Sequence, residues 1–377
     1  MKICIITHLP FWRQNRGSLQ RVYAQIRNIS SFADVNILFL GDFSVFDKRA
    51  LARLGIEKTT FSIVDFDMHF SEIKRASIPH SLKASVNQDY RNRIKSFLSI
   101  NQSDIYIVHN IDNDYLFDHD DFSNHYIIMD THDLRSLRTE SFKEHGRLAE
   151  TEISKDAEYK ILKKYKKIIA IHSKDKIELT SWGISPTNIL IYGHTVLEGN
   201  SPKRGFDKNL VYIGSKNESN IDAINQFIAY VWPYLRKKGF KLHVFGDVCK
   251  FVESHDNLVL LHGNVKDLSA AYDIADIMIN PVNFGSGLKI KNVEAMAYGK
   301  AMVTSPEGAR GIEDASNKAF LLATSIEEQI LCILALENQS LRKALEENAK
   351  EYWFNHFSDE QVSKILEKAL NDCIQES

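Results

Sequence analysis

The sequence predicts an α/β protein built from two doubly wound domains. Short apolar runs rich in β-branched residues alternate with amphipathic stretches along the whole chain, as in parallel sheets that are covered by helices on both faces. The chain has 377 residues, and a single hydrophobic core stops growing at roughly 250–300 residues, so two domains are expected. Its 44% hydrophobic and 25% charged residues are typical of globular proteins and exclude a disordered, collagenous or coiled-coil chain.

The first half of the chain carries a first series of strands. Helical patterns lie between them, for example 18–29, in which Leu19, Val22 and Ile26 share one apolar stripe. The expected strands are 2–7, 35–40, 60–64, 104–109, 125–130, 167–171 and 188–192.

The second half repeats the scheme, and a polar tract at 198–208 separates the two series. We therefore expect an N-terminal domain at 1–200 and a C-terminal domain at 205–357. The tail 358–377 is expected to be a helix that either packs on its own domain or crosses back to complete the first one. The expected strands are 209–214, 241–246, 257–262, 276–280, 301–304 and 319–322, and the expected helices are 220–237, 265–274, 290–298 and 326–336.

Composition and charge exclude several classes of protein. Lys and Arg number 47 against 49 Asp and Glu, a balance that argues against a dedicated nucleic-acid binder. No apolar run approaches the roughly 18–20 residues that span a bilayer, and the first residues are typical of a strand rather than of a signal peptide. We expect a cytoplasmic protein whose four widely spaced cysteines are free thiols: Cys4, Cys249, Cys332 and Cys373.

The densest chemical signal lies at 280–301. An expected strand ends there, a turn with two glycines follows at 284–288, and a helix begins. Glycines permit a close backbone approach to a ligand, and amides at a helix start can hold a phosphate. Lys289 and Lys291 add cations, and Glu294 lies one i,i+3 step from Lys291, where a carboxylate could accept hydrogen bonds from a ribose diol. From spacing alone, a plain glycine turn with a surface Lys–Glu pair fits equally well.

This turn is not a dinucleotide fingerprint. The third glycine of the GxGxxG pattern is replaced by Ile290, and the turn follows a late strand of its domain. A dinucleotide-dependent dehydrogenase is therefore disfavoured. A P-loop kinase is disfavoured too, because the sequence contains no GxxxxGK[ST] motif.

Residues 284–304, FGSGLKIKNVEAMAYGKAMVT, resemble the donor-site signature of the group 1 (family 4) glycosyltransferases, in the branch with the pattern GSGLKIKxxEAMAxG. Residues 125–133, 168–173, 209–214 and 307–311 are also similar to this branch, and the resemblance spans nearly the whole chain, loosely before residue 120. The resemblance implies the GT-B architecture, in which two Rossmann-like domains face a cleft. It also implies a nucleotide-sugar donor, a glycan or lipid-linked acceptor, and transfer that retains anomeric configuration without a metal.

The resemblance implies a role for each matching residue. Glu294 would bind the ribose of the nucleotide, and Lys289 and Lys291 would neutralise its phosphates. His132 would lie at the reaction centre beside Asp133. The other implied donor contacts are the backbone amides of Gly285, Ser286, Gly287 and Leu288, together with Gly17, Ser215 and Lys216.

Two departures from the family pattern leave the donor open. The commonest pattern has two glutamates separated by seven residues, and here the first of them is replaced by Ser286. Relatives also often place an arginine on the pyrophosphate after the first strand of the second domain, where this chain has only Lys216. Acceptor contacts are expected in the loops 8–17, 66–90 and 110–124.

Several alternatives stay open at this point. A nucleotide-sugar epimerase on the same architecture would need further acids, for which Asp112, Asp114 and Glu140 are candidates. The second alternative function is that of a non-catalytic subunit of a glycosyltransferase complex. His109 and Asn110 end a strand and either touch a ligand or act in capping. The lysine-rich run 160–167 is either a solvated helix face or a surface for anionic lipid at the inner membrane.

Overall fold

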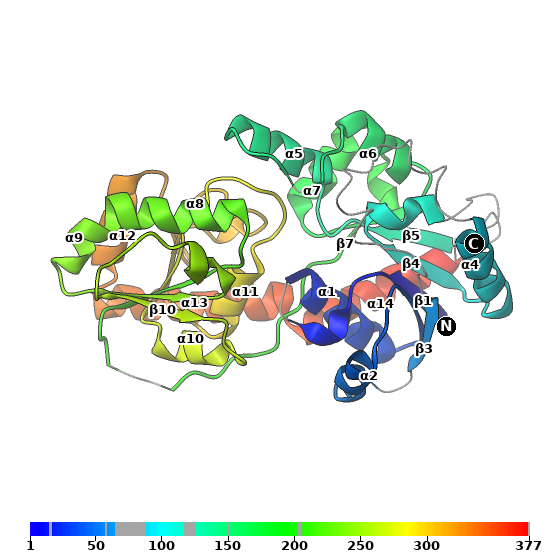
Figure 1. The fold of residues 1–377 in the computed structure, drawn as a ribbon, viewed down its shortest axis with the longest axis horizontal. Coiled ribbons are helices and arrows are strands. Elements are labelled where there is room, and N and C mark those ends of the chain that lie inside the picture. Colours follow the sequence, from blue (N-terminus) through cyan, green and yellow to red (C-terminus); the bar gives the residue numbers. More distant parts are fainter. Residues whose placement is uncertain are drawn as a thin grey trace. The chain divides into compact units, whose positions relative to one another are not determined.

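The computed structural model describes residues 1–14, 17–56, 59–64, 88–116, 126–149, 151–202 and 205–375. The chain forms two compact units (Figure 1). The first comprises Met1–Thr195 together with Val362–Ser377, and the second comprises Val196–Gln361. The predicted domains were 1–200 and 205–357, followed by the tail 358–377.

The first unit is built on a seven-stranded sheet with the order β3-β2-β1-β4-β5-β6-β7. All neighbouring strands are parallel. The order reverses between β1 and β4, which is the place where open α/β sheets bind ligands. The strands are β1 (Lys2–Thr7), β2 (Asp34–Leu40), β3 (Thr59–Val64), β4 (Ile105–His109), β5 (Tyr126–Asp130), β6 (Lys167–Ala170) and β7 (Ile189–Ile191).

Helices cover both faces of this sheet, because its strands are apolar on both sides. Along β1, Ile3 and Ile5 belong to the core on one face, whereas Cys4 and Ile6 belong to the core on the other. Figure 1 shows α1, α2 and α14 on one side and α6 and α7 on the opposite side. The helices are α1 (Gly17–Ser30), α2 (Val45–Ala52), α4 (Gln88–Ile100), α5 (Arg135–Glu144), α6 (Lys155–Leu162), α7 (Ser173–Ser181) and α14 (Asp359–Gln375), with short 3-10 turns η1 (Phe11–Arg13), η3 (Ile111–Leu116) and η5 (Pro186–Asn188).

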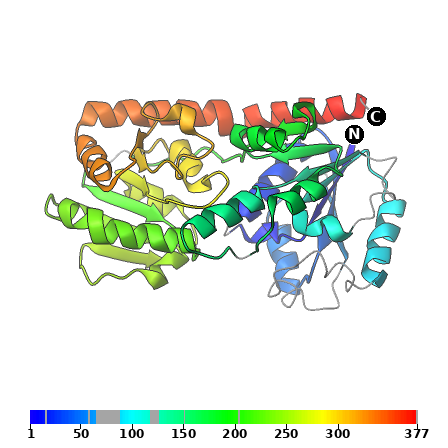
Figure 2. The same ribbon diagram turned by 90° about the horizontal axis from the view of Figure 1, so that it is seen from above.

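The C-terminal helix α14 is part of the first unit from Val362 onward. Its buried residues Val362, Leu366, Leu370 and Cys373 recur at helical spacing and join the same core as α1 and β1. Met1 packs against this core as well. Figure 2 shows α14, in red, along the outside of the first unit.

The second unit contains a six-stranded parallel sheet with the order β10-β9-β8-β11-β12-β13. The expected strands of the second half are all present, with shifts of a few residues at their ends. They are β8 (Asn209–Ile213), β9 (Lys241–Phe245), β10 (Val259–Gly263), β11 (Ile277–Asn280), β12 (Met302–Thr304) and β13 (Leu321–Leu322). The helical elements are α8 (Glu218–Gln226), η6 (Phe227–Val231), α9 (Trp232–Arg236), η7 (Asp247–Phe251), α10 (Ser269–Ile274), α11 (Ile290–Ala297), η8 (Glu313–Ala315), α12 (Ile326–Ala335) and α13 (Gln339–Phe357).

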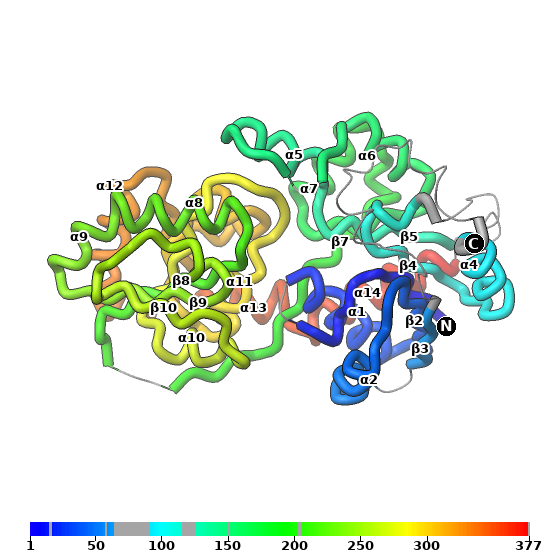
Figure 3. Tube along the Cα trace, viewed as in Figure 1, coloured from blue at the N-terminus to red at the C-terminus, as the bar shows by residue number. Residues whose placement is uncertain are grey.

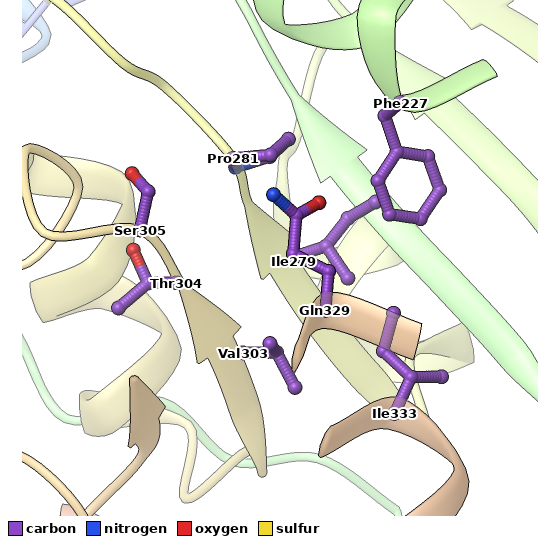
Figure 4. Close-up of a pocket in the computed structure, with 8 residues that line it drawn as sticks. All are labelled: Phe227, Ile279, Pro281, Val303, Thr304, Ser305, Gln329 and Ile333. Carbon is purple, nitrogen blue, oxygen red and sulfur yellow. The ribbon is translucent and has the colours of Figure 1, made fainter. Parts of the chain in front are cut away.

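The single helix expected at 220–237 is interrupted by a π-helical turn, η6, between α8 and α9 (Figure 3). Pro233 has no backbone N–H, so it cannot donate to the preceding turn of an α-helix. The N–H of Trp232 instead reaches back five residues to the carbonyl of Phe227. The wider turn orients Phe227 toward β11 and α12, where it lines a small hollow with Pro281 and Gln329 (Figure 4).

Among the described residues, no helix combines the length and apolar character needed to cross a membrane.

Replacing Leu366 by Ala should lower the free energy of unfolding of the first unit by about 2–5 kcal/mol, because the side chain is 1% exposed and its loss leaves a cavity. Urea denaturation read by amide hydrogen exchange in β1 and β2 would measure this loss. The matched control is Ile365→Ala, since Ile365 is 55% exposed on the same helix and should change stability by less than about 0.5 kcal/mol. Equal effects of the two changes would contradict the packing of α14 on this unit.

Candidate functional site

The predicted glycine turn lies between β11 and α11 in the second unit. Gly285 has φ 136° and Gly287 has φ 68°, both in the region that favours glycine. The first residue of α11 is Ile290. The backbone amides of the turn are therefore placed at a strand end and a helix start, as the sequence predicts.

The side chain of Lys289 forms hydrogen bonds with the backbone of this turn. Its Nζ donates to the carbonyls of Ser286 (3.2 Å) and Gly287 (3.1 Å) and to Oε1 of Glu307 (2.7 Å). A lysine ammonium has three N–H donors, and these three acceptors match them. In this structure Lys289 stabilises the turn, whereas its predicted contact with phosphate stays a prediction.

Glu307 is a residue of the site to which the sequence analysis gave no role. It follows β12, and its carboxylate lies between the Lys289 ammonium and the guanidinium of Arg310, whose Nη2 is 2.8 Å from Oε2. Burial raises the pKa of Glu307, but Lys289 and Arg310 outweigh burial and bring it below its usual value. A Cβ atom at Gly285 would lie 3.8 Å from Oε1 of Glu307. A carboxylate thus adjoins the turn in which Ser286 replaces the first glutamate of the family pattern.

Lys291 extends to the carboxyl end of β8. Its Nζ donates to the carbonyl of Ile213 (3.0 Å) and to Oδ1 of Asn220 (3.1 Å), and it lies 4.4 Å from the centre of the Tyr212 ring. These three partners are uncharged. Burial, with a smaller contribution from Lys289, lowers the pKa of Lys291 to about 7.

Ser215 and Lys216 follow β8 and are exposed. Asn220 donates to both the carbonyl and the hydroxyl of Ser215 at 3.2 Å, so one amide side chain connects Ser215 with Lys291. The structure therefore brings Lys291, Ser215 and Lys216 to the same strand end. Their predicted contacts with a pyrophosphate are compatible with this position.

Glu294 lies one turn into α11 and is partly buried. Its Oε2 accepts a hydrogen bond of 2.7 Å from the hydroxyl of Tyr272 in α10. The Tyr272 ring stacks on that of Tyr298, with ring centres 4.4 Å apart. Two aromatic rings thus orient the carboxylate that the sequence assigns to the ribose.

Asparagines that the sequence analysis missed hold the strand ends together. Asn280 donates to Oδ1 of Asn292 (2.9 Å), and Asn292 donates to the carbonyl of Gly308 (2.8 Å). Gly308 is required here, because a Cβ would lie 2.1 Å from Oγ1 of Thr304. The sequence signal that could have found this network is the presence of asparagines in otherwise apolar segments.

In the first unit, His132 follows β5 with a left-handed backbone, φ 61°. Its backbone N–H donates to Oδ1 of Asp130 (3.2 Å), and its Nε2 lies 2.7 Å from Nδ1 of His109 at the end of β4. Asp130 is fully buried and accepts hydrogen bonds from Arg21 (3.0 Å) and Gln25 (2.9 Å). Burial alone would raise the pKa of Asp130, but the Arg21 charge lowers it to about 2.

Asp133, predicted beside His132, is buried and forms an ion pair with Arg138. Gly17 is the first residue of α1. Of the predicted acceptor loops, residues 15–16, 66–87 and 117–124 lie outside the described residues.

The acids considered for an epimerase either form ion pairs within the first unit or are exposed. Asp112 pairs with Arg135, and Asp114 pairs with Lys164 and accepts a hydrogen bond from Tyr165. Glu140 is exposed on α5.

His109, Asp130 and His132 place possible metal-ligand atoms within 4.8 Å of one another. However, the Asp130 oxygens already accept hydrogen bonds from Arg21 and Gln25, so a divalent cation there would lie beside a guanidinium. The geometry fits a paired carboxylate better than a metal ligand.

The lysine-rich run 160–167 is partly used within the fold. Lys164 pairs with Asp114, and Lys167 donates to the carbonyl of Thr187. Lys160, Lys163 and Lys166 remain exposed.

Residues 207–337 match the family model for glycosyl transferases group 1. The matched segment lies within the second unit, Val196–Gln361. A glycosyltransferase of Methanocaldococcus jannaschii, described as uncharacterized, is 36% identical over 104 residues. The match spans 26% of this chain and 26% of that protein.

Solved glycosyltransferase structures share the fold of the whole chain. HepE of Anabaena, solved in complex with UDP and glucose, aligns with a TM-score of 0.69 at 13% identity over 98% of this chain and 99% of its own. A mutant form of TarM of S. aureus, solved in complex with UDP and saccharide ligands, gives 0.74 at 14% identity over 98% and 99%. Sucrose-phosphate synthase of Thermosynechococcus elongatus gives 0.75 at 12% identity over 100% of both chains. The expected GT-B fold, with two Rossmann-like α/β units, is confirmed.

Replacing Arg21 by Met should cost about 3–5 kcal/mol of unfolding free energy, because it leaves the Asp130 carboxylate buried without a countercharge. The double change Arg21→Met, Asp130→Asn should cost less than the single one. Hydrogen exchange in β1 and β5 during urea denaturation at pH 7 would measure both, with the exposed Arg53→Met as control. A double variant less stable than Arg21→Met would show that the pair is not coupled in this way.

Proposed function

We propose that the protein transfers a sugar from a nucleotide-sugar donor to a glycan or lipid-linked saccharide acceptor. The observation that carries the proposal is the combination of the glycine turn, the oriented Glu294 and the partly buried Lys291 within the segment that matches the glycosyltransferase model. The UDP complexes of HepE and TarM support a nucleoside diphosphate as the bound group. The donor sugar and its base are left open.

The chemistry follows from the leaving group. Negative charge grows on the diphosphate as the glycosidic bond breaks, and fixed N–H dipoles and ammonium groups in a partly dry site stabilise that charge better than water does. The amides of the turn and Lys291 supply such groups in the second unit. The reaction that we propose is metal-independent and retains the anomeric configuration.

His132 is the residue that we assign to the reaction centre, with Asp133 beside it. Its side chain stands at the carboxyl end of β5, where open parallel sheets bind their ligands. We place the acceptor on the first unit and the enzyme in bacterial surface polysaccharide or glycoconjugate synthesis. A cytoplasmic position with peripheral contact to the inner membrane through Lys160, Lys163 and Lys166 belongs to the same proposal.

Donor turnover tests the function directly. Purified protein incubated with a panel of nucleotide sugars should slowly release free diphosphate from its own donor, as transferases often hydrolyse donor without acceptor. In the Glu294→Ala variant kcat/KM should fall at least about tenfold, since hydrogen bonds to a charged group contribute about 1.5–3 kcal/mol. Glu347→Ala, at an exposed position of α13, is the matched control.

The two outcomes against the proposal differ. Turnover of no donor, together with no binding of any nucleoside diphosphate in calorimetry, would remove the transferase assignment. Binding without turnover would favour the non-catalytic subunit.

The lowered pKa of Lys291 predicts that nucleotide binding is coupled to proton uptake. Its pKa of about 7 leaves the side chain mostly neutral at pH 8, and a bound diphosphate would raise this pKa. Binding of UDP at pH 8 should therefore take up about one proton, and affinity should fall as the pH rises above 7. Calorimetry in two buffers of different ionisation enthalpy measures the uptake. The uptake should vanish in Lys291→Met, and identical heats for the wild type in both buffers would contradict the coupling.

A further inference from the structure

Two imidazoles meet at the carboxyl edge of the first sheet. Nδ1 of His109, the last residue of β4, lies 2.7 Å from Nε2 of His132, which is a hydrogen-bond distance. The rings meet edge to face, with centres 5.0 Å apart. His109 is 0% exposed, whereas His132 is partly buried.

The surroundings keep both rings neutral. His8, His109, His132 and the Arg21 guanidinium oppose an additional positive charge, and among the described residues the Asp130 carboxylate is the negative group that acts on both rings. Burial is the largest cause: it lowers the pKa of His109 to about 4 and that of His132 well below its ordinary value. One neutral ring must therefore donate to the other.

The unpartnered nitrogens indicate which ring donates. Within the part of the chain that the structure describes, neither Nε2 of His109 nor Nδ1 of His132 has a hydrogen-bond partner, and both atoms are buried. If His109 carried its proton on Nε2, an N–H without a partner would lie in the interior of a fully buried residue, which is rarer than an unpaired acceptor. With the proton on Nδ1, His109 donates to His132, and the unpaired N–H moves to Nδ1 of the partly buried ring.

The backbone conformation of His132 is a second observation, separate from the ring contact, that shows how this residue is positioned. His132 has φ 61°, a conformation that is strained for an L-residue and persists where the surroundings impose it. Here the Asp130 carboxylate holds the His132 N–H, and Arg21 and Gln25 hold Asp130. Asp130 thus places the backbone of His132, and His109 places its ring.

We propose that His109 is a positioning residue that donates its Nδ1–H to Nε2 of His132 and thereby makes His132 a hydrogen-bond donor through Nδ1–H. The group that accepts this bond is an oxygen of the bound substrates, a phosphate or a sugar hydroxyl. The inference rests on the proposed transferase function for that substrate class. The tautomer itself is a property of the free protein.

Nitrogen-15 NMR of histidine-labelled protein at pH 7 tests the tautomer without any turnover. The His132 ring, assigned by comparison with a His132→Gln variant, should show a protonated Nδ1 and an unprotonated Nε2. His109→Leu should shift this ring to the ordinary mixture of tautomers, since its donor is gone. A protonated Nε2 on His132 in the wild type would overturn the inference, as would an unchanged ring in His109→Leu.

Donor kinetics add a readout that a merely structural role would not change. His109→Leu should lower kcat/KM about three- to tenfold, the value of one hydrogen bond. His109→Asn should restore much of the lost kcat/KM, because the side-chain amide N–H of asparagine can occupy the position of the Nδ1–H donor. Toward pH 8 the activity of the wild type should fall as Lys291 loses its proton, but toward pH 6 it should not decline, because His132 stays neutral. In His109→Leu activity should also decline toward pH 6, because loss of the neighbouring ring raises the pKa of His132.

The two proposals can fail separately. Wild-type turnover with the Nδ1–H tautomer supports both of them. The Nδ1–H tautomer without turnover and without binding of any nucleoside diphosphate supports the His109 assignment and rejects the transferase. Equal loss of activity in His109→Leu and His109→Asn, with an unchanged pH profile, would reduce His109 to a packing role.

Discussion

Every strand of each sheet runs parallel to its neighbours, and the site depends on this constraint. Parallel strands place all their carboxyl ends at one edge, so residues far apart in the sequence meet there. In the first unit the ends of β4 and β5 bring His109 to His132. In the second unit Lys291 reaches the end of β8, and Lys289 joins the glycine turn after β11 to Glu307 after β12. The sheets are apolar on both faces, so this edge is where polar chemistry can be placed.

Lys289 and Lys291, which flank the start of α11, show how two lysines close in the sequence can have different surroundings. Lys289 has a carboxylate and two carbonyls around its ammonium, so its charge is compensated within the fold. Lys291 instead contacts a carbonyl, an amide oxygen and an aromatic ring, all uncharged. A partly buried cation whose contacts are uncharged is costly, and an anionic ligand would lower that cost. Two lysines that lie two positions apart in the sequence thus differ in their surroundings, since one contacts a carboxylate and the other contacts uncharged groups.

Local patterns made much of the fold predictable. The strands, the glycine turn and the helix that carries Glu294 all follow from short runs of sequence, because strand and turn formation depends on near neighbours. The π-turn before Pro233 was missed, although a proline inside a helical pattern is a signal for an irregular turn. The pairs that set the chemistry join residues 18, 23 and 109 positions apart, namely Lys289–Glu307, His109–His132 and Arg21–Asp130. No spacing rule connects such residues until the sheet order is known.

The course of α14 has a consequence for how the protein is made. The second unit is one continuous segment, Val196–Gln361, whereas the first unit needs residues from both ends of the chain. On the ribosome the second unit has all its residues before the helix that covers one face of the first sheet has been synthesised. Helix α1 packs on the same core as Ile3, Ile5 and Ile37, but the part of this apolar face that α14 covers stays open until that seventeen-residue helix emerges. A chaperone that shields apolar surface would have its longest opportunity at this face of the nascent chain.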